Sequence, residues 1–127
     1  MTIKIDRFDH LVLTVSDINA SCDFYSRVLG MQIVAFGENR KGLVFGNQKI
    51  NLHEQGNEIE PKADKPTPGS ADFCLVTLTP LNDVISHLRK ENVTILEGPA
   101  ARTAATGPIL SVYFRDPDKN LIEISNY

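Results

Sequence analysis

The chain lacks the features that mark secreted, disulfide-stabilised proteins. Its 127 residues include two cysteines, Cys22 and Cys74, and no tryptophan. The two thiols form no Cys-x-x-Cys pair, so we expect reduced packing residues rather than a disulfide framework. The amino terminus carries charges at every second or third position and has no apolar core like that of a signal peptide. We therefore expect a cytoplasmic protein.

Long apolar runs and an excess of positive charge are also absent. No run approaches the roughly 20 residues that a helix needs to cross a bilayer, so we expect no membrane span. The 13 basic and 16 acidic residues leave a formal net charge of -3, and the basic residues do not gather along one helix. This balance gives no electrostatic footprint for nucleic acid and favours a small molecule as the partner.

The elements predicted for the first half follow the order βαβββ. A strand with alternating apolar residues is predicted over residues 7–15, and a helix with one apolar face over 17–29. Ser16 or Asp17 is the expected N-cap of this helix, and Gly30 its stop signal. Three short strand candidates follow, at residues 31–36, 42–45 and 49–53.

The same order returns after a linker. Residues 61–69 are rich in proline and glycine, which neither a helix interior nor a central strand tolerates. A strand over 71–79 and a helix capped by Thr79 come next, and then strands at 93–96, 109–115 and 121–126. We expect a single α+β domain with two tandem βαβββ modules, at about 5–55 and about 71–127, and a linker at about 56–70.

Three of these strand candidates carry a metal-ligating side chain between apolar neighbours: His10, His53 and Glu123. Two imidazoles and a carboxylate are a common ligand set for a catalytic divalent metal. A soluble strand normally has neutral residues at such positions, so the placement indicates a cavity rather than a plain core. For a single histidine, a hydrogen-bonded role in the core is the alternative.

Three stretches of sequence carry a resemblance to a known family. They are FDHLVLTV at residues 8–15, FYSRVLGM at 24–31 and VYFRDPDKNLIE at 112–123. Together with the repeated module order, they make the chain similar to the vicinal oxygen chelate (VOC) superfamily. This superfamily includes glyoxalase I, extradiol dioxygenases, and fosfomycin- and bleomycin-resistance proteins. Within it, the chain looks closest to the branch of glyoxalase domain-containing and virulence-associated proteins.

The resemblance implies that each module curls into an incomplete barrel whose first and last strands supply metal ligands. His10 matches the first-strand position of module one, and Glu123 the last-strand position of module two. Asn51 and Asp72 stand at the two remaining positions, where other members have glutamate and histidine. His53 lies two residues beyond Asn51 on the same strand face and could replace it as a ligand. Glu123 and Asp72 are the candidates for acid or base catalysis.

The resemblance also implies a function and an assembly. We expect an enzyme that uses a divalent metal (Zn, Ni, Mn, Fe or Co) on a small oxygen-rich molecule, as a glyoxalase-like lyase or isomerase or as a dioxygenase. The alternative is a metal-independent protein that sequesters a drug, like the bleomycin-resistance proteins. We further expect a homodimer in which His10 and His53 of one chain meet Asp72 and Glu123 of the other. The loop cations Arg40, Lys62, Lys65 and Arg102 are candidates to bind an anionic substrate.

Overall fold

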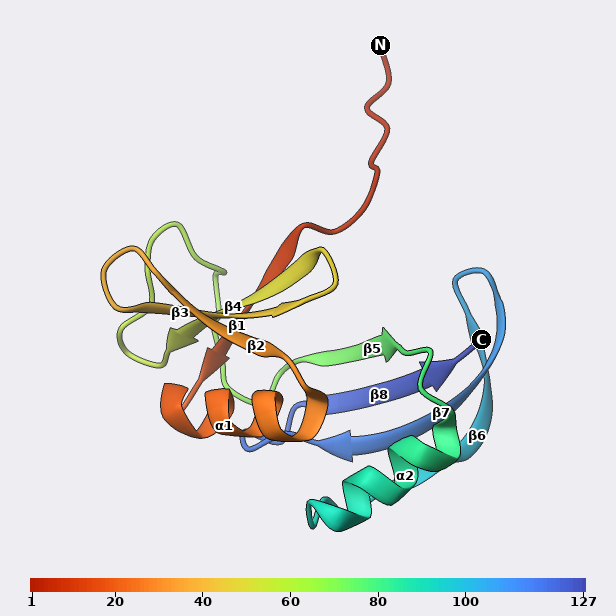
Figure 1. The fold of residues 1–127 in the computed structure, drawn as a ribbon. Coiled ribbons are helices and arrows are strands. Elements are labelled where there is room, and N and C mark those ends of the chain that lie inside the picture. The colour runs from red at the N-terminus through yellow and green to blue at the C-terminus, as the bar shows by residue number, and fades with distance from the viewer. The chain divides into compact units, whose positions relative to one another are not determined.

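The computed structural model covers residues 1–127 and has two compact units, Met1–Pro66 and Thr67–Tyr127. Each unit contains one four-stranded sheet and one helix, and its elements follow the order βαβββ (Figure 1). The predicted α+β fold with tandem βαβββ modules is confirmed. The boundary between the units falls within the segment, about 56–70, that the sequence analysis assigned to the linker.

The first unit consists of five elements. They are β1 (His10–Val15), α1 (Ile18–Leu29), β2 (Gln32–Phe36), β3 (Arg40–Phe45) and β4 (Gln48–Glu54). The sheet has the order β1-β4-β3-β2, in which β1 runs parallel to β4 and the other neighbours are antiparallel. The parallel pair is possible because α1 and two strands separate β1 from β4 in the chain and so provide a long crossover.

Local sequence sets both ends of α1. The side chain of Asp17 accepts hydrogen bonds from the backbone N–H groups of Asn19 and Ala20, at 2.9 and 3.2 Å, which makes it the N-cap. Gly30 ends the helix in the left-handed conformation. The apolar face of α1, with Tyr25 fully buried, packs on β2, β3 and β4. One face of this sheet is therefore covered by the helix.

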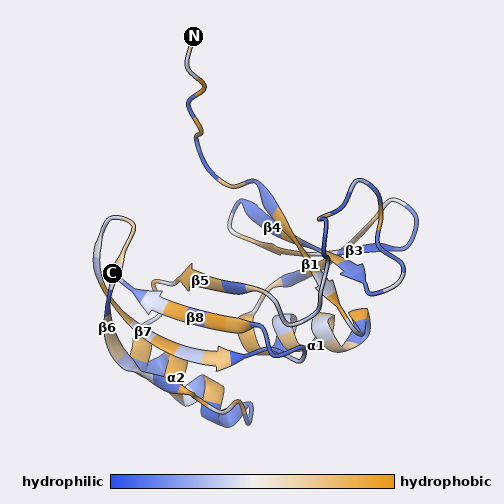
Figure 2. Ribbon diagram, turned by 180° about the vertical axis from the view of Figure 1, so that it is seen from behind, coloured by the Kyte–Doolittle hydropathy of each residue, from blue (hydrophilic) through white to orange (hydrophobic).

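The second unit repeats this plan. Its elements are β5 (Asp72–Val76), α2 (Leu81–Lys90), β6 (Glu97–Ala104), β7 (Gly107–Arg115) and β8 (Leu121–Asn126). The sheet has the order β5-β8-β7-β6, and β5 is parallel to β8. Leu81 and Leu88 of α2 are buried, and the helix packs on β7. Figure 2 shows that α2 carries both hydrophobic and hydrophilic residues.

Two local features of the second unit differ from the prediction. Thr79 does not cap α2, which begins after Pro80 without a side-chain cap; instead, Asn126 Oδ1 accepts a hydrogen bond from the N–H of Leu81 at 2.8 Å. No strand forms at 93–96; instead, β6 lies between the strands expected at 93–96 and 109–115 and includes Pro99. β6 tolerates this proline because it is an edge strand whose register with β7 shifts at that point.

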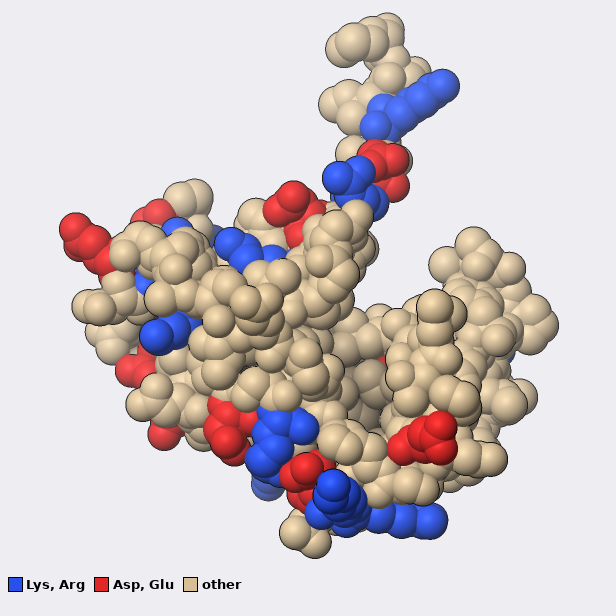
Figure 3. Space-filling view, viewed as in Figure 1, with Lys and Arg blue, Asp and Glu red and all other residues tan.

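Strand alternation gives each sheet a second face that the helix does not cover. In β1, Leu13 and Val15 are buried toward α1, whereas His10 and Val12 on the other face are exposed. On the surface drawn in Figure 3, acidic and basic side chains are interspersed instead of forming a large patch of one sign. Neither helix has the length and apolarity that a membrane span needs.

The turn before β8 is held by side-chain hydrogen bonds. Asp116 Oδ1 accepts from the N–H groups of Asp118 and Asn120, both at 2.9 Å, and Asp116 Oδ2 accepts from Asn120 Nδ2 at 2.8 Å. Asn120 Oδ1 in turn accepts from the N–H of Ala71, just before β5, at 2.8 Å. These bonds join the starts of the two parallel strands, so the turn helps to set the register that places Glu123.

Replacement of Asn120 by alanine should therefore destabilise the protein strongly. The side chain is almost fully buried, and its loss removes the hydrogen bond to Asp116 Oδ2 and the acceptor of the Ala71 N–H. We expect the free energy of unfolding to fall by about 2–4 kcal/mol, measured by urea denaturation. Asn82→Ala, at an exposed position in α2, is the control and should change stability little. Equal stability of the two variants would contradict this role of Asn120.

Candidate functional site

Strand register gives the two modules equivalent positions on their uncovered faces. His10 is the first residue of β1, and it lies opposite the β4 residue that comes two positions before Asn51. In the same way, Asp72 is the first residue of β5, and it lies opposite the β8 residue that comes two positions before Glu123. His10 and Asn51 are thus diagonal neighbours on one face of the first sheet, and Asp72 and Glu123 are their counterparts in the second. The structure gives these four residues the equivalence that the repeat implied.

His10 combines an exposed ring with one engaged nitrogen. Its side chain is 46% exposed, and its Nδ1 lies 2.8 Å from Oδ1 of Asp9. The hydrogen bond to His10 lowers the pKa of Asp9, which favours a carboxylate at this position. With Nδ1 engaged, Nε2 is left for another partner. A carboxylate that holds one imidazole nitrogen while the other faces outward is the usual arrangement behind a metal-ligating histidine.

Asn51 is buried in the centre of its sheet and has an unsatisfied atom. The side chain is 5% exposed, and its Oδ1 has no hydrogen-bond partner. A buried carbonyl oxygen without a partner costs free energy, so such atoms are rare unless a ligand, ion or water satisfies them. Asn51 lies on the same face of the sheet as His10, two residues or roughly 6.6 Å farther along the strands, which suits an oxygen ligand in the same site.

His53 lies farther along β4 and faces a different environment. It pairs with Thr14, two same-face steps from the position of His10, which corresponds to roughly 13 Å along the strands. The register therefore does not bring His10 and His53 of one unit together. Instead, His53 is 5% exposed and lines a pocket of about 230 Å³ with these residues: Val12, Thr14, Pro61, Lys62, Ala63 and Pro66.

The surroundings of His53 favour a neutral imidazole. Burial, followed by the positive charge of Arg40, lowers the pKa of His53. Lys62 acts in the same direction, and Glu58 opposes them. Lys62 is itself paired with Glu58 and Glu60, at 3.7 and 3.6 Å, so part of its charge is compensated. A neutral imidazole can accept a hydrogen bond from a ligand in the pocket through its unprotonated nitrogen.

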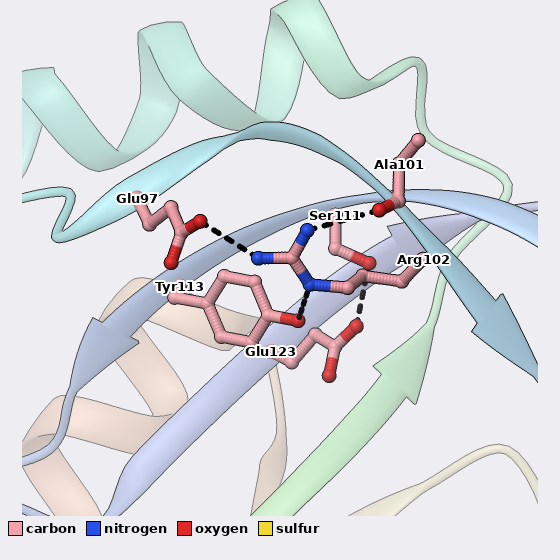
Figure 4. Close-up of polar contacts among 6 residues, drawn as sticks. All are labelled: Glu97, Ala101, Arg102, Ser111, Tyr113 and Glu123. Carbon is pink, nitrogen blue, oxygen red and sulfur yellow. Dashed lines mark hydrogen bonds and ion pairs between the residues drawn. The ribbon is translucent and has the colours of Figure 1, made fainter.

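Glu123 is held by hydroxyl groups on its own sheet. Ser111 donates to Glu123 Oε2 at 2.6 Å, and Ser125 lies 3.4 Å from the same oxygen. Tyr113 lies directly opposite Glu123 in β7. Figure 4 shows Ser111 and Tyr113 converging on Glu123 from the neighbouring strand. Sequence reasoning chose Glu123 but missed the two serines, because a serine within a strand gives no signal of its own.

Arg102 is engaged within the second unit. Its guanidinium donates to Tyr113 Oη at 3.0 Å, to Glu97 Oε1 at 2.7 Å and to the carbonyl oxygen of Ala101 at 2.9 Å (Figure 4). Burial, opposed by the hydrogen bond from Arg102 but aided by the negative charge of Glu123, raises the pKa of Tyr113, so the phenol keeps its proton at neutral pH. The network orders the side chains beside Glu123.

The donor atoms fit a divalent metal, although one unit alone does not supply a full set. Within the structure no three His, Cys, Asp or Glu side chains gather closely enough to hold an ion. The first unit offers the imidazole of His10 and the unsatisfied oxygen of Asn51. The second offers the carboxylate of Glu123 and, at the exposed start of β5, that of Asp72. Nitrogen and oxygen donors of this kind suit borderline and hard divalent cations.

Acidification should destabilise the fold through His53. Because its pKa is lower in the folded state, the unfolded chain takes up a proton first, so stability is lost as the pH falls from about 6.5 through the folded pKa. We expect wild-type protein, freed of metal by chelation, to lose more stability between pH 7.5 and pH 5.5 than His53→Gln, measured by urea denaturation. His87→Gln, on the exposed side of α2, should behave like wild type. Parallel losses in wild type and His53→Gln would contradict the assignment.

Comparison with known proteins gives a family that spans almost the whole chain. The pattern of the Glyoxalase/Bleomycin resistance protein/Dioxygenase superfamily matches residues 7–124. Virulence protein STM3117 of Salmonella typhimurium is 62% identical over 97% of this chain and 85% of that protein. Glyoxalase domain-containing protein RDO1 of Mycosarcoma maydis is 52% identical over 98% of this chain and 70% of its own length.

Solved structures give the same fold. The crystal structure of the Salmonella virulence protein superposes with a TM-score of 0.97 at 61% identity, covering 98% of this chain and 99% of that one. A more distant match by sequence is metallothiol transferase FosB of Staphylococcus epidermidis, 26% identical over 96% of this chain and 82% of that protein. The antibiotic-binding protein TnmS3 of a Streptomyces species has a TM-score of 0.76 at 19% identity, covering 98% of each chain. The chain therefore belongs to the glyoxalase/bleomycin resistance/dioxygenase, or VOC, superfamily.

Proposed function

We propose that this protein is a divalent-metal-dependent VOC enzyme that acts on a small oxygen-rich molecule, with His10 and Glu123 as metal ligands. One observation carries the proposal: each side chain has one atom engaged in a hydrogen bond and a second donor atom that remains available to bind a metal. Asp9 engages Nδ1 of His10, and Ser111 donates to Oε2 of Glu123. Support of this kind behind a ligand fixes its orientation and is typical of metal sites.

Asn51 suits the ligand set better than His53. Asn51 is offset from His10 by two residues on the same sheet face and has a buried oxygen without a partner. His53 is offset by four residues and lines a pocket. We assign His53 to contact with the substrate, for which its neutral imidazole is suited. Alanine variants of both residues test this division: Asn51→Ala should weaken metal binding, and His53→Ala should leave it unchanged but weaken binding of substrate.

The bound metal would act as a Lewis acid toward two neighbouring oxygens of the substrate. The side chains would position that substrate and move its protons. Asp72, the diagonal neighbour of Glu123, is exposed at the start of β5 and is the proposed base, because a carboxylate outside the ligand set can accept a proton. The relative FosB is named as a metallothiol transferase, which supports metal chemistry on this fold. Lyase, isomerase and dioxygenase reactions all agree with these residues.

Elemental analysis tests the proposed ligands. Wild-type protein purified without chelator or affinity tag should contain close to one divalent metal ion per chain, and both His10→Ala and Glu123→Ala should lose it. His87→Ala is the matched control, because it removes an imidazole from the exposed side of α2. Wild type that holds no metal even after reconstitution with Zn, Ni, Mn, Fe or Co would overturn the proposal.

We further propose a homodimer in which His10 of one protomer and Glu123 of the other bind the same ion. Neither His10→Ala nor Glu123→Ala homodimers should then bind metal. If the two variants are unfolded together and refolded as a mixture, about half of the dimers are mixed and each regains one intact site, so about a quarter of wild-type metal content should return. A mixture that forms mixed dimers but stays free of metal would contradict the shared site.

Drug sequestration without metal is the second candidate function. The uncovered sheet faces carry half-exposed apolar residues beside the polar ones, with Val12 45% and Val76 56% exposed, which suits an apolar ligand. The likeness to the antibiotic-binding protein TnmS3 supports this only at the level of the fold. Tight binding of a small molecule by chelated protein, equal in wild type and Glu123→Ala, would favour sequestration over metal catalysis.

A further inference from the structure

Glu123 ends a chain of hydrogen bonds that runs through two fully buried serines. Ser111 Oγ is 2.6 Å from Glu123 Oε2 and 2.7 Å from Ser125 Oγ, and Ser125 Oγ is 3.2 Å from Cys74 Sγ. Both serines have no exposed surface. They face each other across the β7–β8 pair, on the same strand face as Glu123. The three oxygen-bearing side chains therefore form one compact cluster.

The direction of these hydrogen bonds follows from the number of protons that each group can donate. An ionised carboxylate only accepts, and each serine hydroxyl has one proton to donate. Ser111 must therefore give its proton to Glu123, and Ser125 gives its own toward Ser111 and Glu123. The thiol of Cys74 is left to donate to Ser125. Every hydroxyl of the cluster is thus oriented toward one oxygen of one carboxylate, Oε2.

The first unit has no such cluster at the equivalent position. Asn51, the counterpart of Glu123, lies opposite Gly42, whereas Glu123 lies opposite Tyr113. Asn51 Oδ1 has no hydrogen-bond partner at all, while Glu123 Oε2 interacts with two serine hydroxyls. The repeated fold does not by itself require serines around the last strand. Burying two hydroxyls costs free energy unless they are bonded, and here their bonds serve Glu123.

We propose that Ser111 and Ser125 are positioning residues that fix Glu123 as a metal ligand. The inference rests on the proposed metal function and goes beyond it by assigning what holds the carboxylate. By occupying Oε2, the serines restrict rotation of the carboxylate and direct Oε1 to the ion. Ligand-supporting groups of this kind typically change metal affinity by about 10-fold to 100-fold when they are removed.

Zinc affinity, measured by competition with a chromogenic chelator, tests the assignment in the full chain. Ser111→Ala and Ser125→Ala should each bind Zn²⁺ about 10-fold to 100-fold more weakly than wild type. Ser86→Ala, which removes a serine hydroxyl from α2, is the matched control and should bind like wild type. Visible absorption of the Co²⁺ form should shift in both serine variants.

Other results would overturn the inference. If Glu123→Ala loses zinc while both serine variants bind it like wild type, the positioning role fails and the proposed function stands. If Glu123→Ala itself binds zinc like wild type, the proposed function fails and the inference fails with it. An equal loss from the control Ser86→Ala would show a general structural effect. Should Ser111→Ala not fold, Ser111→Cys keeps the size of the side chain with a weaker donor and should give an intermediate affinity.

Discussion

The structure depends on one constraint: each small sheet buries one face under a helix, so strand alternation sends every second side chain to the other face. In β8, Ile122 and Ile124 pack into the core, and Glu123 between them must point the other way. The same alternation in β1 places Leu13 in the core and His10 outside. Burial of the apolar residues thus determines the side on which the polar ones can act, without any contribution from the polar residues themselves.

The two units share this constraint but surround equivalent positions with different side chains. The second unit surrounds Glu123 with hydroxyls and anchors the start of β8 through Asn120. The first unit leaves Asn51 Oδ1 buried and unpaired. It also adds a pocket between β1, β4 and the segment after β4, with His53 in its wall. One module is built to hold a carboxylate firmly, while the other offers a buried acceptor and a small binding pocket.

In the proposed site, some residues hold the metal ligands in place and others provide space for the substrate. A metal needs ligands whose orientation is set before it binds, and such orientation comes from hydrogen bonds behind the ligand. Asp9 supplies this support for His10, and the serine cluster supplies it for Glu123. Substrate needs space and adaptable polar contacts, which the pocket beside His53 provides. The cations predicted to bind an anionic substrate are partly committed elsewhere, since Arg102 pairs with Glu97 and Lys62 with two glutamates.

Sequence alone determined the repeated βαβββ order, the end of α1 at Gly30, its start at Ser16 or Asp17, and the face on which His10 and Glu123 lie, because these follow from local periodicity and capping. It did not reveal β6, where an edge position lets a strand contain Pro99. Only tertiary structure decided that Asn51, and not His53, is the diagonal neighbour of His10, and that two serines hold Glu123. Register and contacts between strands arise from pairing of residues far apart in the chain, which the spacing along the sequence does not encode.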